Sequence, residues 1–333
     1  RQCTLKITIL LSMFRYIRLK DWWSFIIPPI ITFYCIGLIL INSKSSTLST
    51  LLFSFFLFLV LTISTAAFGF FINEWSDIKD DTIAGKENTL SNAKQHTLIL
   101  LLLFIISGIV ASAYLLKLNK ITQIIICVQL ILLLLYSVPP FRLKRFKYLA
   151  VILDATYSGA LFYILAIIIG SNYHRFSVFW MYLLFFWSIT KGIRNILHHL
   201  IQDKKYDAAL RFKTVATANN TSTLEHFIFF GLLPLESILF ILFLYRFYYG
   251  KLFITMYLLY WVYIIFRKNY IIPFIIKRKQ TITHSMSTEI NLFYEKIFPL
   301  FVFIVLCYKD VRMLILFALY LIVFFIPMVL KKV

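Results

Sequence analysis

Long hydrophobic runs recur along the 333-residue chain, and short polar segments separate them. A helix needs about 20 mainly apolar residues to cross the hydrocarbon core of a bilayer, where it satisfies its own backbone hydrogen bonds. The pattern therefore predicts an all-α protein, a polytopic transmembrane helical bundle of about nine or ten spans. The last two spans are close together, so one broken helix is an alternative there. The expected spans cover residues 22–41, 48–72, 96–116, 120–137, 148–170, 177–200, 225–247, 252–275, 291–308 and 311–330.

The same pattern predicts the domain organisation. Residues 1–21 mix apolar and basic side chains before Trp22 and Trp23, which is typical of an interfacial segment with an aromatic anchor. Residues 22–330 are expected to form a single transmembrane domain. The cytosolic motif loops are expected at residues 73–95, 138–147 and 191–213.

Composition and charge narrow the class of protein. The chain is 61% hydrophobic and 14% charged, whereas soluble domains have roughly 25% charged residues. Its 34 Lys and Arg against 14 Asp and Glu raise the alternative of nucleic-acid binding. The basic residues, however, lie in short segments between apolar runs, as the positive-inside rule predicts. We therefore expect membrane lipids and no nucleic acid as partners.

The distribution of basic residues also predicts the orientation. With the N-terminus inside, 25 of the 34 Lys and Arg residues lie in cytosolic segments and 8 in outer loops, which favours this orientation.

Four of the 14 acidic residues lie within one stretch, Asn73–Asp81, at the end of a hydrophobic run. If the stretch is helical, Asn73, Asp77 and Asp81 are four residues apart and form one stripe. Oxygen ligands of this kind suit a hard divalent cation, especially Mg²⁺ shared with a phosphorylated substrate. Glu74 lies beside the stripe and is a further expected metal ligand. The alternative is a solvated loop that ends a helix.

A second stripe of polar residues follows about 125 residues later. Its members, each four residues apart, are Lys191, Asn195, His199, Asp203 and Asp207. Four-residue steps on a helix drift by about 40°, so only three consecutive members share a face well. Asp203 and Asp207, with His199 or Gln202 above them, are the expected metal ligands. The alternative is a surface pattern in which neighbouring lysines pair with the two carboxylates.

Basic residues near the two acidic stretches are candidates to neutralise the phosphate oxygens of a diphosphate, because Lys and Arg bind phosphate through charge-assisted hydrogen bonds. They are Lys86, Arg142, Lys144 and Lys213. The alternative for each of them is that the positive-inside rule requires a basic residue at that position in any case.

These segments resemble the signatures of the UbiA superfamily of intramembrane prenyltransferases. Asn73–Asp81 is similar to the first signature, Asn-Asp-x-x-Asp-x-x-x-Asp, with Glu74 in place of the first Asp. Tyr136–Lys144 contains the complete segment Tyr-Ser-x-Pro-Pro-x-Arg-Leu-Lys, which is common in the family. The residues that resemble the second signature are Asp203, Asp207, Lys213 and Thr214.

Other positions depart from the family pattern. Asn88-Thr89-Leu90 stands where the family often has Arg-Pro-Leu, and His198-His199 stands where many members carry another carboxylate. These two departures bear on the identity of the acceptor. The ten expected spans also exceed the nine that are typical of the family.

The resemblance implies a bundle around a central cavity that is open to the cytosolic side. It implies Mg²⁺-dependent transfer of a polyprenyl group from polyprenyl diphosphate to a lipophilic acceptor, aromatic and similar to a quinone precursor, within the membrane. The expected location is the bacterial inner membrane. The implied catalytic carboxylates are Asp77, Asp81, Asp203 and Asp207. The implied metal ligands are these four together with Asn73, Glu74 and His199.

Two other functions compete with this interpretation. The first is a terpene cyclase of the same fold, in which a double bond of the prenyl chain replaces the acceptor. The second is a non-enzymatic lipid transporter, which would carry ionisable residues midway through its spans. Most ionisable residues here cluster at the ends of the hydrophobic runs, which argues against transport.

Overall fold

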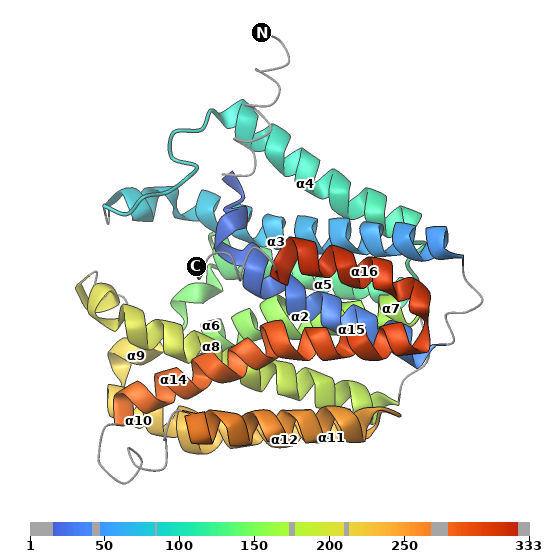
Figure 1. The fold of residues 1–333 in the computed structure, drawn as a ribbon. Helices are drawn as coiled ribbons and strands as arrows, with labels where there is room; N and C mark the ends of the chain where they lie inside the picture. The colour runs from blue at the N-terminus through green and yellow to red at the C-terminus, as the bar shows by residue number, and fades with distance from the viewer. Residues whose placement is uncertain are drawn as a thin grey trace. The chain divides into compact units, whose positions relative to one another are not determined.

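Backbone N–H and C=O groups find no water in hydrocarbon, so the apolar segments must satisfy these groups internally. The computed structural model describes residues 16–41, 47–83, 85–172, 177–209, 213–267 and 279–325, which contain helices and turns but no β-strand (Figure 1). The predicted all-α class is confirmed. Most of the expected interfacial segment 1–21 and the end of the last expected span lie outside the described residues.

The described residues form two compact units, of which the first draws on residues 16–30, 47–83, 85–143 and 312–325. In this unit α3 packs against α4 and α5. The close approach of α4 depends on Gly108, because a Cβ atom at this position would lie 2.4 Å from Oγ of Ser64. The helices of the first unit are the start of α2 (Leu19–Leu40), α3 (Leu48–Ile83), α4 (Gln95–Leu115), α5 (Lys120–Ser137), α16 (Leu314–Tyr320) and the π-helical η7 (Leu321–Phe325).

The second unit draws on residues 31–41, 144–172, 177–209, 213–267 and 279–311. In this unit α8 packs against α6, α9, α11 and α14. Three π-helical segments, η3, η4 and η5, each continue directly into an α-helix. The elements of this unit are the end of α2, η2 (Leu143–Arg145), α6 (Lys147–Ala155), η3 (Thr156–Ala160), α7 (Leu161–Gly170), α8 (Val178–Ala209), α9 (Val215–Ala218), α10 (Thr221–His226), η4 (Phe227–Leu232), α11 (Leu233–Tyr245), α12 (Gly250–Arg267), α14 (Lys279–Leu292), η5 (Phe293–Ile297) and α15 (Phe298–Lys309).

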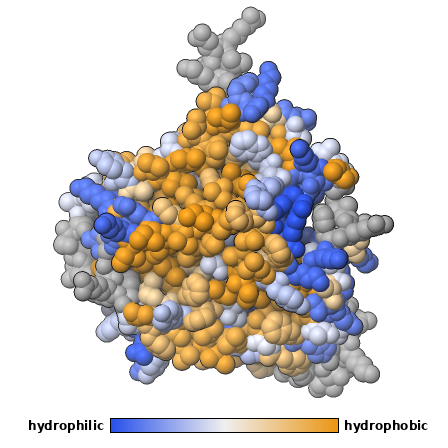
Figure 2. All heavy atoms as spheres, turned by 180° about the vertical axis from the view of Figure 1, so that it is seen from behind, coloured by the Kyte–Doolittle hydropathy of each residue, from blue (hydrophilic) through white to orange (hydrophobic). Residues whose placement is uncertain are grey.

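Seven helices of the described residues are long and apolar enough to cross a membrane, and two shorter apolar helices, Gly250–Phe266 and Val311–Phe325, accompany them. Hydrophobic residues cover much of the face shown in Figure 2. On α4, Leu100 and Phe104 are 62% and 65% exposed, as expected of side chains that face lipid. The chain is an integral membrane protein, and its number of spans stays a prediction.

Two helices are longer than a bilayer requires. α3 has 36 residues and α8 has 32, which correspond to about 54 Å and about 48 Å of helix. The hydrocarbon core is only about 30 Å thick. Residues 73–83 and 191–209, which we expected within loops, instead complete α3 and α8. Each acidic stretch therefore lies on the last turns of a long helix.

A buried ion pair joins two helices of the second unit. Arg194 of α8 and Glu236 of α11 are 0% and 1% exposed, and they form two hydrogen bonds, Nε to Oε2 at 2.6 Å and Nη2 to Oε1 at 3.0 Å. Arg194 also donates to Oδ1 of Asn291 at 2.8 Å. Because both charges have left water, each depends on its partner for compensation.

Residues 31–41 of α2 pack within this second unit. The ring of Phe33 lies 4.7 Å from that of Tyr163, centroid to centroid. Gly170 lies against the backbone of Tyr34, where a Cβ atom would come within 2.1 Å of the carbonyl oxygen. The ammonium group of Lys309 donates hydrogen bonds to the carbonyl groups at the end of α2, including that of Ile41 at 2.5 Å. The end of α15 thus caps the end of α2.

Gly170→Ala should lower the thermal unfolding midpoint of the detergent-solubilised protein by roughly 3–5 °C, because overpacking typically costs about 1–3 kcal/mol. The methyl group would overlap the carbonyl oxygen of Tyr34. Gly159→Ala is the matched control, since a Cβ atom at Gly159 would meet its nearest atom, Ser188 O, at an ordinary 3.8 Å. Equal midpoints for the two variants would contradict this packing.

Glu236→Gln should reduce the free energy of unfolding by about 3–5 kcal/mol, because it leaves the buried guanidinium of Arg194 without a counter-charge. The double substitution Arg194→Met and Glu236→Met should cost less than the single one, since it removes both buried charges. Unfolding by denaturant in detergent would measure the two differences. A double variant less stable than Glu236→Gln would contradict the argument.

Candidate functional site

The first acidic stretch is helical to its end, because α3 continues to Ile83. At about 100° per residue, Asn73, Asp77 and Asp81 span less than a quarter of the helix circumference. Asn73 is held from α5, where Oγ of Ser137 donates to its Oδ1 at 3.3 Å. The stripe expected from the sequence therefore exists as one face of α3.

Arg142 lies against this face and contacts two carboxylates. Its Nη2 is 2.6 Å from Oδ1 of Asp77, and its Nη1 is 2.8 Å from Oδ2 of Asp80. The Arg142 backbone has a left-handed φ of 41° and follows the cis peptide bond between Pro139 and Pro140. The Nε atom of Arg142 is buried and has no hydrogen-bond partner among the described residues. This guanidinium offsets part of the negative charge of the motif and keeps one unused donor.

Glu74 is held on the neighbouring face of α3. Its Oε1 accepts a hydrogen bond from Nη1 of Arg18 at 2.5 Å, and its Oε2 accepts from the amide and the hydroxyl of Thr89, each at 3.3 Å. Trp22, fully buried, donates to the carbonyl of Ile17 at 2.9 Å and so fixes the segment that carries Arg18. The Glu74 carboxylate therefore ties two other segments to α3.

Asn88 connects the turn after α3 to the motif. Its Nδ2 donates to Oδ2 of Asp81 at 2.8 Å and to the carbonyl of Glu74 at 2.9 Å, while its Oδ1 accepts from the amide of Leu90 at 3.0 Å. Asn88 and Thr89 belong to the tripeptide that departs from the family pattern. The sequence analysis assigned these two residues no part in the site. Their departure from the family pattern was the feature that could have pointed to them.

Lys86 lies in the turn that carries Asn88, after Gly85, whose φ of +65° favours glycine. The amide of Lys86 donates to the carbonyl of Asp81 at 2.9 Å, and its side chain is exposed. Within the described residues the Lys86 ammonium group forms no ion pair with the motif, so it remains available to a ligand.

The second acidic stretch lies on the last turns of α8. Nδ1 of His199 is 3.1 Å from Oδ2 of Asp203, and both side chains are mainly exposed. Asp207 follows one turn later and is half-buried. Lys204 donates to the carbonyl of Asn219 at 2.9 Å and to Oγ1 of Thr221 at 3.0 Å, rather than to the carboxylates. The alternative in which Lys204 pairs with the acids is therefore not the observed arrangement.

The upstream members of the second stripe lie inside the second unit. Nζ of Lys191 donates to the hydroxyl of Tyr163 at 3.0 Å and lies 5.7 Å from the ring centroid of Tyr294. Oδ1 of Asn195 accepts from Nδ2 of Asn291 at 3.0 Å. These residues stabilise the core of the unit, whereas the later members of the stripe are open to solvent.

The remaining basic candidates are also in the second unit. Lys144 is half-buried in η2, and Lys213 is exposed immediately before the cap of α9. Thr214 forms that cap, because its Oγ1 accepts from the amide of Thr217 at 3.2 Å.

Asp154 is a further carboxylate that sequence reasoning missed. It lies in the apolar helix Lys147–Gly170 and accepts a hydrogen bond from the hydroxyl of Tyr157. The π-helical η3 begins two residues later, and π-helical turns occur frequently at functional sites. Ionisable residues within spans are functional by default. A single Asp in an apolar run could therefore have identified Asp154 as a candidate from the sequence.

The residues at the end of α3 fit Mg²⁺ that is shared with a phosphate group. Among the described residues, no group of three or more His, Cys, Asp and Glu side chains is placed to hold a metal ion by itself. Mg²⁺ is usually bound through one or two carboxylates plus substrate phosphates. Asn73, Asp77 and Asp81 supply hard oxygen atoms from one helix face, which agrees with that mode of binding.

Comparison with protein families gives one match. Residues 27–273 match the family model described as the UbiA prenyltransferase family. A comparison with curated protein sequences gives no significant match.

Solved structures of this fold resemble the chain over most of its length. A digeranylgeranylglyceryl phosphate synthase has a TM-score of 0.63 and 17% identity, and the match covers 90% of this chain and 99% of that one. A UbiA homologue from Archaeoglobus fulgidus, bound to GPP and Mg²⁺, has a TM-score of 0.59 and 16% identity, with 89% and 99% covered. The same homologue bound to Cd²⁺ has a TM-score of 0.59 and 15% identity, with 91% and 99% covered. At these identities the likeness shows a common fold.

Arg142→Gln should lower the free energy of unfolding in EDTA by about 2 kcal/mol, because it removes the cation between two partly buried carboxylates. Excess Mg²⁺ should recover part of this loss, since a divalent cation then relieves the repulsion between Asp77 and Asp80. Lys79→Gln is the matched control, because Lys79 is an exposed residue of the same helix. Thermal unfolding in EDTA and in Mg²⁺ would measure both effects. Equal losses in the two variants would contradict the role of Arg142.

Proposed function

Because this chain belongs to the UbiA prenyltransferase family, we propose that it transfers a polyprenyl group from polyprenyl diphosphate to a lipophilic, aromatic acceptor inside the membrane. The observation that carries the proposal is the face of oxygen ligands formed by Asn73, Asp77 and Asp81 at the end of an apolar helix. Ionisable residues at membrane depth mark substrate or ion sites, and ligands at the end of an apolar helix suit a substrate with a charged head and a hydrophobic tail.

In this proposal each acidic stretch would hold Mg²⁺ together with a diphosphate. Asn73, Asp77 and Asp81 provide oxygen atoms from α3. Asp203 and Asp207 provide them from α8, with His199 one turn above. When bound, Mg²⁺ supplies positive charge beside the departing diphosphate oxygens.

Glu74 has a different role from these metal ligands. Its two carboxylate oxygens are engaged by Arg18 and Thr89, which supports a positioning role. Glu74 would hold the N-terminal segment and the turn after α3 against the motif, and Asn88 would in turn orient Asp81.

The basic residues bind the diphosphate. Arg142 has an unused buried Nε–H donor, and Lys86 and Lys213 are exposed near the ends of the acidic helices. Charge-assisted hydrogen bonds from these groups strengthen as negative charge develops on the leaving group. Lys144, which ends the Tyr136–Lys144 segment, contributes a further cation.

The proposed reaction breaks the bond between C1 of the prenyl chain and the diphosphate oxygen, and the bonding electrons leave with the diphosphate. The acceptor then forms a bond to C1 and loses a proton. The apolar side chains of the spans exclude water, which would otherwise capture the allylic cation. Arg142 holds Asp77 and Asp80 in place, so the ligands need little rearrangement when substrate binds.

The distribution of Lys and Arg supports an orientation in which both acidic stretches face the cytosol. The charged head of a prenyl diphosphate on the cytosolic side would then reach the site without crossing the membrane.

Asp77→Asn and Asp203→Asn should each lower diphosphate release by roughly 100-fold or more, because each removes a charge that holds the cation beside the leaving group. Purified protein would be assayed with geranyl, farnesyl and geranylgeranyl diphosphate, a membrane-lipid extract as acceptor, and either Mg²⁺ or EDTA. Glu87→Gln, an exposed acid just beyond α3, is the control and should retain full turnover.

Wild-type turnover in Asp77→Asn or Asp203→Asn would overturn the proposal of two cation sites. Mass spectrometry of the lipid product decides between transfer and cyclisation. A cyclic hydrocarbon or alcohol formed from donor alone would replace the transferase proposal with the terpene cyclase.

A further inference from the structure

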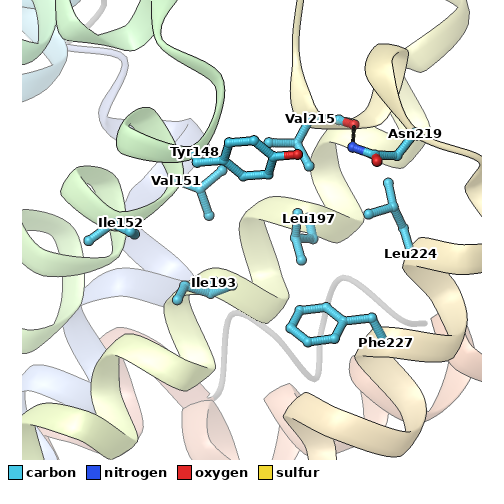
Figure 3. A pocket seen from close by; sticks show the side chains of 9 residues that line it. All are labelled: Tyr148, Val151, Ile152, Ile193, Leu197, Val215, Asn219, Leu224 and Phe227. Atoms are coloured by element: carbon cyan, nitrogen blue, oxygen red, sulfur yellow. Dashed lines mark hydrogen bonds between the residues drawn. The ribbon is translucent and has the colours of Figure 1, made fainter.

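The second unit contains an apolar slot with a volume of about 290 Å³. Its walls come from α6, α8, the α9–α10 segment and η4, as Figure 3 shows. Its lining residues are Tyr148, Val151, Ile152, Ile193, Leu197, Val215, Asn219, Leu224 and Phe227.

The slot has a closed floor and an open rim. Its floor is buried, with Val151 and Leu197 only 5% and 4% exposed. At the rim, Ile152 and Phe227 are 47% and 52% exposed. Both rim residues belong to apolar helices long enough to span a membrane. Where these two helices cross a bilayer, the medium that reaches this rim is lipid.

Two polar groups lie together at one end of the slot. The ring of Tyr148 directs its hydroxyl toward Val215 and Asn219 (Figure 3). Nδ2 of Asn219 donates to the carbonyl of Val215 at 2.8 Å, and its Oδ1 accepts no hydrogen bond from any described residue. The Tyr148 side chain is 64% exposed, so its hydroxyl is accessible at this end. The slot is thus apolar along its length and polar at one end.

A positive charge lies beside this polar end. The Lys204 ammonium group is bound to the carbonyl of Asn219 and to Oγ1 of Thr221. An ammonium group has three N–H donors, and the described residues accept two of them. The third donor remains for an anionic group at the rim, where no acidic residue lines the slot.

The slot is separate from the face of α8 that carries the acidic stretch. Leu197 of the slot and Asp203 are six residues apart, which corresponds to about 120° around a helix. Lys204 lies on the slot side of α8, because it is seven residues, or about two helical turns, after Leu197 and so points in nearly the same direction. A molecule in the slot is therefore distinct from a diphosphate bound at Asp203.

We propose that this slot binds one acyl chain of an anionic phospholipid, with the phosphate beside Lys204 and an ester oxygen or phosphate oxygen at the Tyr148 hydroxyl. The apolar walls and open rim fit the chain, and the polar end fits the headgroup. By filling the space between α6 and α9, the lipid stabilises the α9–α10 segment. This proposal requires a membrane-embedded protein and does not depend on prenyl transfer.

The test is native mass spectrometry of the detergent-purified full chain, titrated with phosphatidylglycerol or with phosphatidylcholine of the same acyl chains. The wild type should bind phosphatidylglycerol more tightly. Lys204→Gln should weaken phosphatidylglycerol binding by about fivefold, the effect of roughly one juxtamembrane basic residue, and leave phosphatidylcholine unchanged. Lys205→Gln, an exposed neighbour with the same change of charge, should match the wild type.

A second pair of variants tests the apolar part. Ile152→Trp narrows the slot at its exposed rim and should weaken the binding of both lipids. Leu149→Trp is the control, because Leu149 is an exposed residue of α6 outside the slot. Equal losses in Lys204→Gln and Lys205→Gln, or in the two Trp variants, would overturn the proposal. One-for-one displacement of the lipid by farnesyl diphosphate would also overturn it and would identify the slot as a site for the prenyl chain.

Discussion

Carboxylates at the end of an apolar helix repel one another unless positive charge lies among them, and much of the first unit follows from this constraint. Four acids occur within the last turns of α3, where the adjoining hydrocarbon reduces the solvent that would screen them. Arg142 contacts two of the four, and Arg18 contacts a third. The segments that carry these arginines are thereby drawn to the end of α3.

The same constraint distinguishes two charged pairs in the second unit, one buried and one exposed. Deep in the unit, Arg194 and Glu236 compensate each other and have no access to solvent. Such a pair adds little net stability, but removal of one member is costly. At the end of α8, by contrast, His199 and Asp203 are mainly exposed. The first pair therefore holds helices together, whereas the second remains open to a ligand.

Periodicity was sufficient to predict the helices and the stripe on α3, because a helix repeats every 3.6 residues whatever surrounds it. It also predicted that Asn73, Asp77 and Asp81 share a face. The contact between Arg18 and Glu74 was not predictable, since the two residues are 56 positions apart and meet only through tertiary packing. The partners of Lys204 were also not predictable. Nearly every residue has a backbone carbonyl oxygen, so the sequence does not show which one accepts the hydrogen bond. The lengths of α3 and α8 were underestimated, because the helices continue through residues 73–83 and 191–209, where the sequence is already polar.

The hydrogen bonds from Lys309 to the end of α2 connect residues that are 268 and 270 positions apart. During synthesis, residues 31–41 leave the ribosome long before their partners in α15 exist, at about 5–20 residues per second. The carbonyl groups at the end of α2 therefore wait for their partner until about 270 further residues have been made. The second unit closes late in biosynthesis, and truncation before Lys309 would leave an early helix without its cap.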